Sequence, residues 1–373
     1  MGLNKNQRAF ALLKAGLWEK DESLLPLGEI DYSVVQQIAE EQSSVGLVAA
    51  GMEHVVDNKV PKQDLLQFIG QTLQIEEQNK AMNYFIGVLV EKMKDEGIYS
   101  LLVKGQGVAQ SYERPLWRAS GDFDFFLDVD NYEKAKRFLI PLASHVDNED
   151  LNKLHQGMTI EPWAVELHGT MNTVISNRIN RLLIDVQKDI FNNGGIRCWN
   201  NEGVEVLLPN PDNDVIIVFT HFINHFYGEG IGLRQVCDWC RLLWKYREQI
   251  DVALLEHRIK KMGLIREWQA FAAFAVYYLG MPEETMPLFV SSKSLKVKAS
   301  KICKLILETG NFGHNKDESY RTRTSKLKSY FITLWHRLKE FARLATIFPC
   351  NAPIFFPDLC FKKSKSDIMS VML

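Results

Sequence analysis

The sequence predicts an α+β protein, in which a segment with both strand and helix signals separates two helical segments. Short apolar runs alternate with helical patterns and turn signals in residues 98–210. Residues 1–97 and 211–350 instead carry apolar side chains at helical spacing. The last segment, 351–373, contains two prolines and a Lys-Lys-Ser-Lys run, so we expect it to be partly disordered. The chain is therefore divided into four regions at these boundaries.

Composition narrows the class of protein. With 373 residues, 46% of them apolar and 24% charged, the chain has the composition of a globular protein with a sizeable core. Its net charge of −2 does not favour a nucleic-acid-binding surface. We find no signal peptide and no apolar run near the ~20 residues of a membrane-spanning helix. Six scattered cysteines are typical of reduced thiols, so we expect a cytoplasmic protein.

The N-terminal region predicts three helices that act as a scaffold for the middle of the chain. Residues 4–18 form the first, and a second runs from an Asp31 cap to about residue 56. The third covers about residues 63–96, with a break expected near Gly70 and Gly97 as its C-terminal cap.

The first part of the middle region predicts a strand, a turn and a helix in succession. Residues 100–103 form an apolar run typical of a buried strand. A Lys-Gly-Gln-Gly turn at residues 104–107 follows it, and residues 108–112 begin a helix. A second strand is expected at residues 121–127, after Pro115.

That second strand carries the strongest chemical signal in the sequence. Because side chains alternate along a strand, Asp122 and Asp124 point to one face. Two carboxylates on an apolar strand are costly without a cation, and a divalent metal with oxygen ligands would compensate them. Asp128 and Asp130 repeat the spacing, but Asp130 followed by Glu133 predicts a helix cap, so they are explained without chemistry.

Two further strands are expected at residues 157–161 and 164–169. On the second, Glu166 and His168 share one face, opposite to the apolar face. Glu166 is equally consistent with a solvent-facing residue, and a structural histidine explains His168 well. The Asn-Asn-Gly-Gly stretch at residues 192–195 predicts a turn.

Helical patterns resume at Asp212 and predict helices at residues 233–246, 252–263 and 267–279. His221 and His225 stand at i, i+4 on the helix that opens at Asp212, but we find no third zinc ligand, so core or pocket histidines are favoured.

Two other pairs on the next helix have structural explanations. Cys237 and Cys240 have redox spacing but lie inside a predicted helix, which favours two buried thiols. Arg234 and Asp238 stand at i, i+4 and can form an ion pair.

A basic amphipathic segment occurs near the C-terminus. Between residues 316 and 343 there are eight Lys or Arg residues against three Asp or Glu residues, with aromatic and leucine side chains at helical spacing. Such a helix can bind a membrane surface or nucleic acid, although an ordinary packed helix with a solvated basic face is favoured.

Together these motifs resemble the nucleotidyltransferase (polymerase β-like) superfamily. The chain is most similar to a family of poorly characterised bacterial nucleotidyltransferases with a Lys-Gly turn and an Arg-x-x-x-Asp-x-Asp motif. The resemblance covers about residues 30–350 and rests on five motifs: Lys104-Gly105, Arg118 to Asp124, Glu166-Leu-His168, the histidines His221 and His225, and Gly232-Leu-Arg234 to Asp238-Trp239. The superfamily turn is most often Gly-Ser, whereas this chain has Gly105-Gln106.

The resemblance implies a mixed-sheet catalytic core and transfer of a nucleoside monophosphate from an NTP, such as ATP, to an acceptor. It implies that Asp122 and Asp124 bind two Mg²⁺ ions, with Mn²⁺ as the alternative ion. Glu166 would complete the acceptor-side metal site or act as general base.

The remaining motif residues would contact the substrates. Backbone N–H groups of Gly105 and Gln106 would hold phosphates, with Lys104 and Arg118 as phosphate-binding cations. The possible acceptor site comprises five residues: His168, His221, His225, Arg234 and Asp238.

Two alternative functions are open from the sequence. The Gly105-Gln106 turn is consistent with a catalytically silent nucleotide-binding or partner-binding module on the same fold. The basic helix within residues 316–343 is consistent with a membrane-surface or assembly protein.

Overall fold

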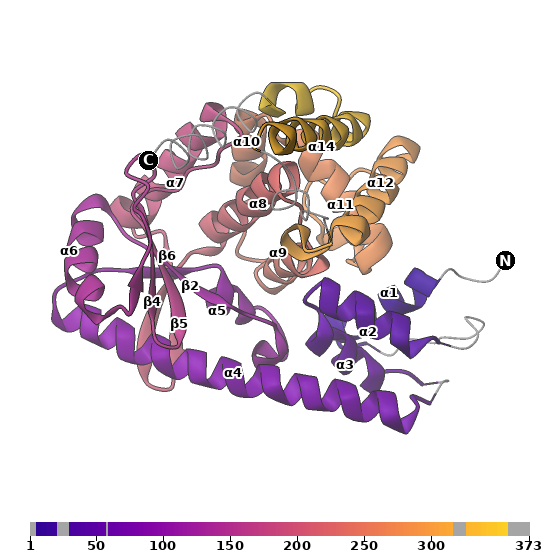
Figure 1. Ribbon diagram of the computed structural model, residues 1–373, viewed down its shortest axis with the longest axis horizontal. Helices are drawn as coiled ribbons and strands as arrows, with labels where there is room; N and C mark the ends of the chain where they lie inside the picture. Colours follow the sequence, from indigo (N-terminus) through magenta and orange to yellow (C-terminus); the bar gives the residue numbers. More distant parts are fainter. Residues whose placement is uncertain (1–4, 21–29, 57–58, 316–325, 357–373) are drawn as a thin grey trace.

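A five-stranded mixed sheet lies between two groups of helices in the computed structural model, which describes residues 5–20, 30–56, 59–315 and 326–356 (Figure 1). The strand order is β1-β2-β5-β4-β3. The strands are β1 (Leu101–Val103), β2 (Asp122–Phe126), β3 (His145–Val146), β4 (His155–Ile160) and β5 (Trp163–His168). The predicted α+β class and mixed sheet are confirmed.

The pairing within this sheet fixes which polar side chains are neighbours. Strands β2 and β5 are parallel, with Asp124 opposite Glu166, and all other pairs in the sheet are antiparallel. Strand β4 places His155 opposite His168. A separate hairpin, β6 (Ile196–Asn201) and β7 (Val204–Pro209), was not predicted as such from the sequence.

The two faces of the sheet differ in chemistry. Phe123 and Phe125 of β2 join Val165 and Leu167 of β5 in an apolar cluster. Helix α6 (Val129–Leu139) and the second half of α4 (Lys62–Asp95) contribute buried side chains to the same cluster. The opposite face, which carries the carboxylates, is therefore left for the C-terminal helices.

Helix α4 connects the sheet to the N-terminal helices. It runs along one side of the molecule, from the sheet to α1–α3 (Figure 1), and it is continuous through Gly70, so the expected break is wrong. Met82, Ile86 and Met93 form its buried stripe toward the sheet. Gly97 has φ of +65° just after the helix end, as its capping role predicts.

The first predicted helix is confirmed as α1 (Lys5–Trp18), but the second is two helices, α2 (Tyr32–Glu41) and α3 (Val45–Glu53). Ser43 between them has φ of +52°, which interrupts the helix. The preceding Gln42 is buried and hydrogen-bonds to the Leu233 N–H and the Ile306 carbonyl. The sequence pattern carried no sign of these distant contacts.

Two helix starts near the site also differ from the sequence prediction. Helix α5 (Gly105–Ala109) begins three residues earlier than expected, directly in the glycine turn. Helix α6 is capped by Asp128, whose side chain accepts the Asn131 N–H, and not by Asp130. Asp130 lies in the first turn of the helix.

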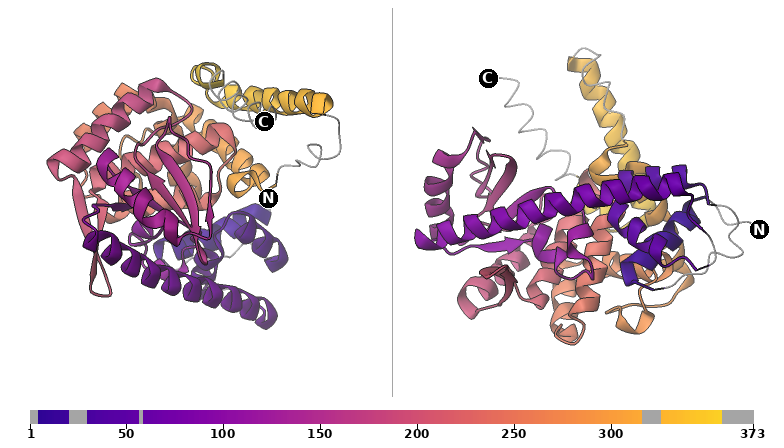
Figure 2. Two further views of the ribbon diagram at one scale, coloured as in Figure 1. Left: turned by 60° about the vertical axis from the view of Figure 1, so that its left-hand side comes forward. Right: turned by 90° about the horizontal axis from the view of Figure 1, so that it is seen from below.

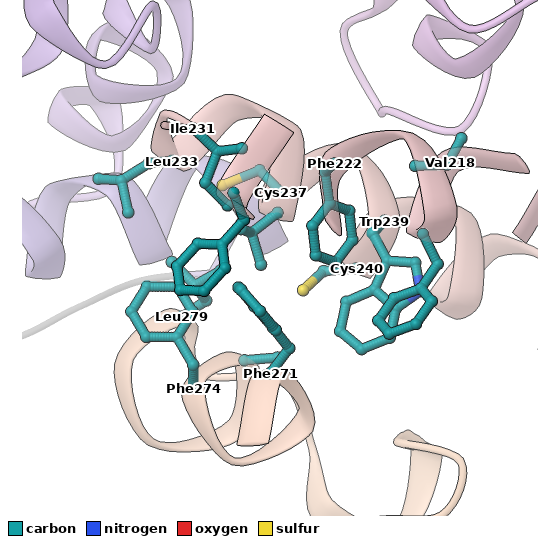
Figure 3. Packing of buried hydrophobic residues seen from close by; sticks show 14 of the residues in the cluster. Val218, Phe222, Ile231, Leu233, Cys237, Trp239, Cys240, Phe271, Phe274 and Leu279 are labelled. Carbon is teal, nitrogen blue, oxygen red and sulfur yellow. The ribbon is translucent and has the colours of Figure 1, made fainter. Parts of the chain in front are cut away.

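The C-terminal helices pack over the carboxylate face of the sheet and against α1–α3. The α-helices that the structure describes after β5 are α7 (Asn177–Asn193), α8 (Pro211–Gly228), α9 (Leu233–Lys245), α10 (Val252–Met262), α11 (Ile265–Leu279), α12 (Lys293–Thr309) and α14 (Lys326–Ile347). Buried side chains of α1–α3 and of α8–α12 belong to one apolar cluster. Figure 3 shows Cys237 and Cys240 within this cluster, which confirms two buried free thiols.

The expected basic helix forms in part as α14, which packs on α12 and stands out from the body of the protein in Figure 2. The structure does not describe residues 316–325, where the basic segment was expected to begin, or residues 357–373, which belong to the tail expected to be disordered. Among the helices that the structure describes, none has both the length and the apolarity needed to cross a membrane.

Candidate active site

A cavity of about 210 Å³ opens between the carboxylate face of the sheet and helices α8 and α9. We call it the site cavity. The sheet side contributes Lys104, Asp122, Asp124 and Glu166, and the helical side contributes His221, His225, Arg234, Asp238 and Phe312. Gly105 and Arg118 also line it.

Three carboxylates face this cavity because of strand geometry. Asp122 and Asp124 are two residues apart on β2 and so share a face, and Glu166 is the register partner of Asp124 on β5. Asp122 is exposed at the start of β2, whereas Asp124 is buried. The three residues that the sequence selected as metal ligands are thus neighbours on one face.

Lys104 reaches Asp124 from the turn after β1. Its Nζ lies 2.6 Å from Asp124 Oδ1. The Lys104 backbone has φ of 58° and ψ of −147°, which is unfavourable for a residue with a side chain. Gly105 follows with φ of +37°. Backbone strain of this kind persists where the surrounding structure holds it, and here it brings the ammonium group to the buried carboxylate.

A second positive group reaches the same oxygen. His168 Nε2 lies 2.7 Å from Asp124 Oδ1 and 3.4 Å from Glu166 Oε2. His155, from the adjacent strand β4, places its Nε2 3.2 Å from that same Glu166 oxygen. Two histidines and two carboxylates therefore form one chain of polar contacts along the sheet.

These contacts and the surroundings of each group shift the pKa values of the three carboxylates in different directions. Burial alone would raise the pKa of Asp124, but the Lys104 charge and the His168 hydrogen bond outweigh burial and lower it. Hydrogen bonds from His155 and His168 lower the pKa of Glu166. Asp122 remains accessible at the strand end, but the protein around it partly removes water from its carboxylate, and this desolvation and the Asp124 charge raise its pKa. Asp122 is thus the carboxylate with the least compensation from protein cations.

Arg118 lines the site cavity, but most of its donors are already used. Its Nε and Nη2 donate to the two Asp238 oxygens at 2.8 and 2.7 Å, and its Nη1 donates to Ala119 O and Ser120 Oγ. These bonds account for about four of the five guanidinium N–H groups. The Tyr112 hydroxyl also donates to Asp238. Arg118 and Asp238 therefore join the loop before β2 to helix α9.

Arg234 is the less committed arginine of the site. Its Nη1 donates to the Ala119 carbonyl at 2.5 Å, while its Nε has no hydrogen-bond partner among the described residues. Burial, followed by the nearby Arg118 charge, lowers the pKa of Arg234. A positive group in this position is best stabilised by an additional anion.

Gln106 is directed away from the cavity. Its Nε2 donates to Asn79 Oδ1 on α4 at 2.7 Å, and the side chain is buried. Asn79 in turn donates to the carbonyls of Leu116 and Arg118. Where the superfamily turn has a serine, this chain has a residue that ties the turn to α4, so only the Gln106 backbone remains for a ligand.

The helical wall of the cavity is aromatic. The rings of His221 and His225 lie 4.6 Å apart, and Phe312 packs edge-on against His225. Burial lowers the pKa of His221 well below its ordinary value, so this ring is neutral at pH 7. These rings lie opposite the carboxylates of the sheet, so part of the helical wall offers flat aromatic surface to the cavity.

The structure thus gathers the residues expected for catalysis, the nucleotide and the acceptor around one cavity, apart from Gln106 and from His168, which contacts the cavity residues Asp124 and Glu166. Sequence reasoning missed His155, Tyr112 and Phe312. His155 precedes the strand that was expected to begin at residue 157, and only the β4–β5 register reveals its place opposite His168. Tyr112 contacts Asp238 across 126 residues, and no local pattern indicates such a contact.

Comparison with protein families identifies one match. The model of a family described as uncharacterised nucleotidyltransferase matches residues 28–280, which is more than half of the chain. The chain belongs to this family. The match covers the whole sheet and every residue that we name in the site cavity except Phe312. No curated protein and no solved structure matches the chain.

Proposed function

We propose that this nucleotidyltransferase-family protein transfers a nucleoside monophosphate from an NTP to an acceptor in a Mg²⁺-dependent reaction. The observation that carries the proposal is the set of three carboxylates on one face of the sheet, Asp122, Asp124 and Glu166, in a cavity that also contains Lys104 and Arg234. Family membership supports the reaction class.

The donor set fits the metal that such a reaction needs. Mg²⁺ takes oxygen ligands and is typically held by one or two carboxylates together with substrate phosphates and water. Asp122 and Asp124 would hold the ions, and Asp122, whose pKa is raised by partial desolvation and by the Asp124 charge, has the most to gain from a cation. When bound, the ions supply neutralisation of phosphate charge and orientation of the attacking and leaving oxygens.

The protein cations have separate roles in this proposal. Arg234 binds the triphosphate, since its Nε is unpartnered among the described residues and the group lines the cavity. Lys104 keeps Asp124 ionised through their 2.6 Å contact and adds positive charge beside the phosphates. Arg118 is a positioning residue, because its bidentate bond to Asp238 fixes the loop that leads into β2.

On the acceptor side, Glu166, which the neighbouring His168 contacts, accepts the proton of the attacking hydroxyl. Both groups line the same face as Asp124 and contact each other. The aromatic rings of His221, His225 and Phe312 offer a stacking surface for a flat group, such as the nucleobase or an aromatic acceptor.

The test is a calorimetric titration of each NTP, with and without Mg²⁺, into the wild type and into the Asp122→Asn and Asp124→Asn variants. We expect Mg²⁺-dependent binding of at least one NTP by the wild type and its loss in both variants. Arg234→Met should weaken binding by more than about tenfold, which corresponds to loss of one charge-assisted phosphate contact.

A second Asp-x-Asp pair provides the matched control. Asp130 lies in the first turn of α6 and outside the residues that line the cavity, so Asp130→Asn should bind nucleotides like the wild type. If the wild type binds no NTP with Mg²⁺, or if the Asp122→Asn and Asp124→Asn variants bind as well as the wild type, the proposal is wrong.

A further inference from the structure

The edge of the site cavity contains a second cluster of metal-ligand side chains, with different chemistry from the aspartates. His155, Glu166 and His168 place one ligand atom each within 4.8 Å of one another. The cluster follows from the register: Glu166 and His168 are two residues apart on β5, and His155 lies opposite His168 on β4. All three side chains therefore project from the same face of the sheet.

The spacing of these atoms matches a single transition-metal ion. A zinc ion bound at about 2.0–2.1 Å by nitrogen and oxygen ligands holds neighbouring ligand atoms about 3.3 Å apart in tetrahedral geometry. The Glu166 Oε2 atom lies 3.2 Å from His155 Nε2 and 3.4 Å from His168 Nε2. Two of the three donor separations thus already match ligands of one ion, and the third pair, the two histidine nitrogens, lies within 4.8 Å.

The cluster is accessible, and a further carboxylate lies beside it. Gly157, opposite Glu166 on β4, has no side chain on this face, and the Asp147 carboxylate occupies the space that a Cβ would take. His155 and Glu166 are half-buried, so an ion from solvent can reach them. Three protein donors with an open side are typical of zinc sites that keep a water or substrate position.

From this geometry we propose that His155, Glu166 and His168 bind a divalent transition-metal ion of the zinc class, which this nitrogen-rich set prefers to Mg²⁺. Imidazole nitrogen suits zinc and its neighbours, whereas Mg²⁺ prefers oxygen ligands and sheds water reluctantly. The ion replaces the hydrogen-bonded proton that now links His168 Nε2 with the two carboxylates.

The inference goes beyond the proposed function and does not rest on it. A catalytically silent protein with the same sheet would hold the same three ligands. Glu166 belongs to both sets, so it does not separate the two proposals. His155 belongs only to the transition-metal set, and Asp122 belongs only to the proposed Mg²⁺ set.

The experiment is equilibrium dialysis of the untagged full-length chain against Zn²⁺ with Mg²⁺ in large excess, with bound metal counted by atomic emission. We expect about one Zn²⁺ per chain in the wild type. His155→Ala should weaken Zn²⁺ binding by more than about tenfold, since loss of even an outer-shell partner costs that much. Circular dichroism spectra of His155→Ala and of a second variant, His155→Gln, show whether the loss of Zn²⁺ binding comes from removal of the ligand and not from misfolding.

Two variants make the result specific. His145→Ala removes an exposed histidine from the neighbouring strand β3 and should bind Zn²⁺ like the wild type. Asp122→Asn should keep Zn²⁺ while losing Mg²⁺-dependent NTP binding, and His155→Ala should show the reverse. The proposal is overturned if the wild type binds no stoichiometric Zn²⁺, or if His155→Ala binds it as well as the wild type, as metal held by cysteines would.

Discussion

Asp124 shows how a carboxylate is accommodated in the middle of an apolar strand. A buried carboxylate without a partner would be protonated or would destabilise the fold. Here Asp124 Oδ1 receives both Lys104 Nζ at 2.6 Å and His168 Nε2 at 2.7 Å. One of these groups comes from a strained turn and the other from the parallel strand, so the site is formed by three separate segments and needs the whole sheet.

The first prediction at the residue scale concerns the pH dependence of stability in EDTA, where no divalent metal competes. Burial disfavours the His168 imidazolium, but hydrogen bonds to Asp124 and Glu166 raise its pKa above the ordinary 6.5. A raised pKa in the folded state means that the protonated form adds stability that is complete below pH 6.5 and is lost as pH rises through the folded-state pKa. We therefore expect the free energy of unfolding to fall above pH 6.5.

His168→Gln supplies the comparison, because glutamine does not titrate. Urea unfolding of both proteins, followed at several pH values above 6.5, should give a smaller pH slope for the variant. The other titratable groups packed around His168 are Lys104, Asp124, Glu166, His155 and His221, and all of them are present in both proteins. Equal slopes in the two proteins would contradict the raised pKa.

Some of the site was predictable from the sequence because its geometry is local. Alternation along a strand places Asp122 with Asp124 without any tertiary information. Arg118 was expected to bind phosphate, but its partner Asp238 is 120 residues away in the chain, and only the fold reveals that ion pair. His155 was missed for the same reason, since a strand register is a property of two strands.

At the scale of elements, the predicted helix boundaries were wrong where distant side chains bind the backbone. Local apolar periodicity favoured one helix through residue 56. Helix α2 instead ends next to Gln42, whose buried side chain hydrogen-bonds to the backbone of Leu233 and Ile306. The break expected at Gly70 does not occur, because a single exposed glycine costs a long helix only about 1 kcal/mol. Distant contacts therefore outweighed local helix propensity at the end of α2, whereas local propensity was enough to keep α4 continuous at Gly70.

The element-scale prediction uses two helical glycines with opposite surroundings. A Cβ added at Gly70 in α4 would meet no atom within 4 Å. Gly70→Ala should therefore raise the free energy of unfolding by about 0.5–1 kcal/mol, through the lower backbone entropy of the unfolded chain. Gly51 in α3 faces the Leu12 carbonyl of α1, and a Cβ there would overlap it.

Gly51→Ala should accordingly lower the free energy of unfolding by roughly 1–3 kcal/mol, the usual cost of overpacking. Both variants make the same chemical change in a helix, so each serves as the control for the other in urea unfolding. A change of the same sign in both would mean that helix propensity, and not the close packing of α1 on α3, determines the effect.

For the whole molecule, the central observation is that the ends of the chain share one core. The Trp18 Nε1 group of α1 donates to the Leu279 carbonyl of α11 at 2.6 Å. Arg241 of α9 is buried and donates to Leu17 of α1 and to Ser111 after α5. The N-terminal helices therefore complete the apolar core on which the helical wall of the site cavity is built.

This shared core predicts that the C-terminal helices do not fold without α1–α3. A chain of residues 59–373 would leave the apolar side chains of α8 and α11 without part of their packing, and such losses cost several kcal/mol out of a typical total of about 5–15 kcal/mol. We expect this chain to lose cooperative thermal unfolding, measured by circular dichroism. A separately added peptide of residues 1–58 should restore the transition, because the missing contacts are noncovalent. If residues 59–373 alone unfold cooperatively, with the same midpoint temperature as the full chain, the prediction is wrong. The core would then be complete without the N-terminal helices.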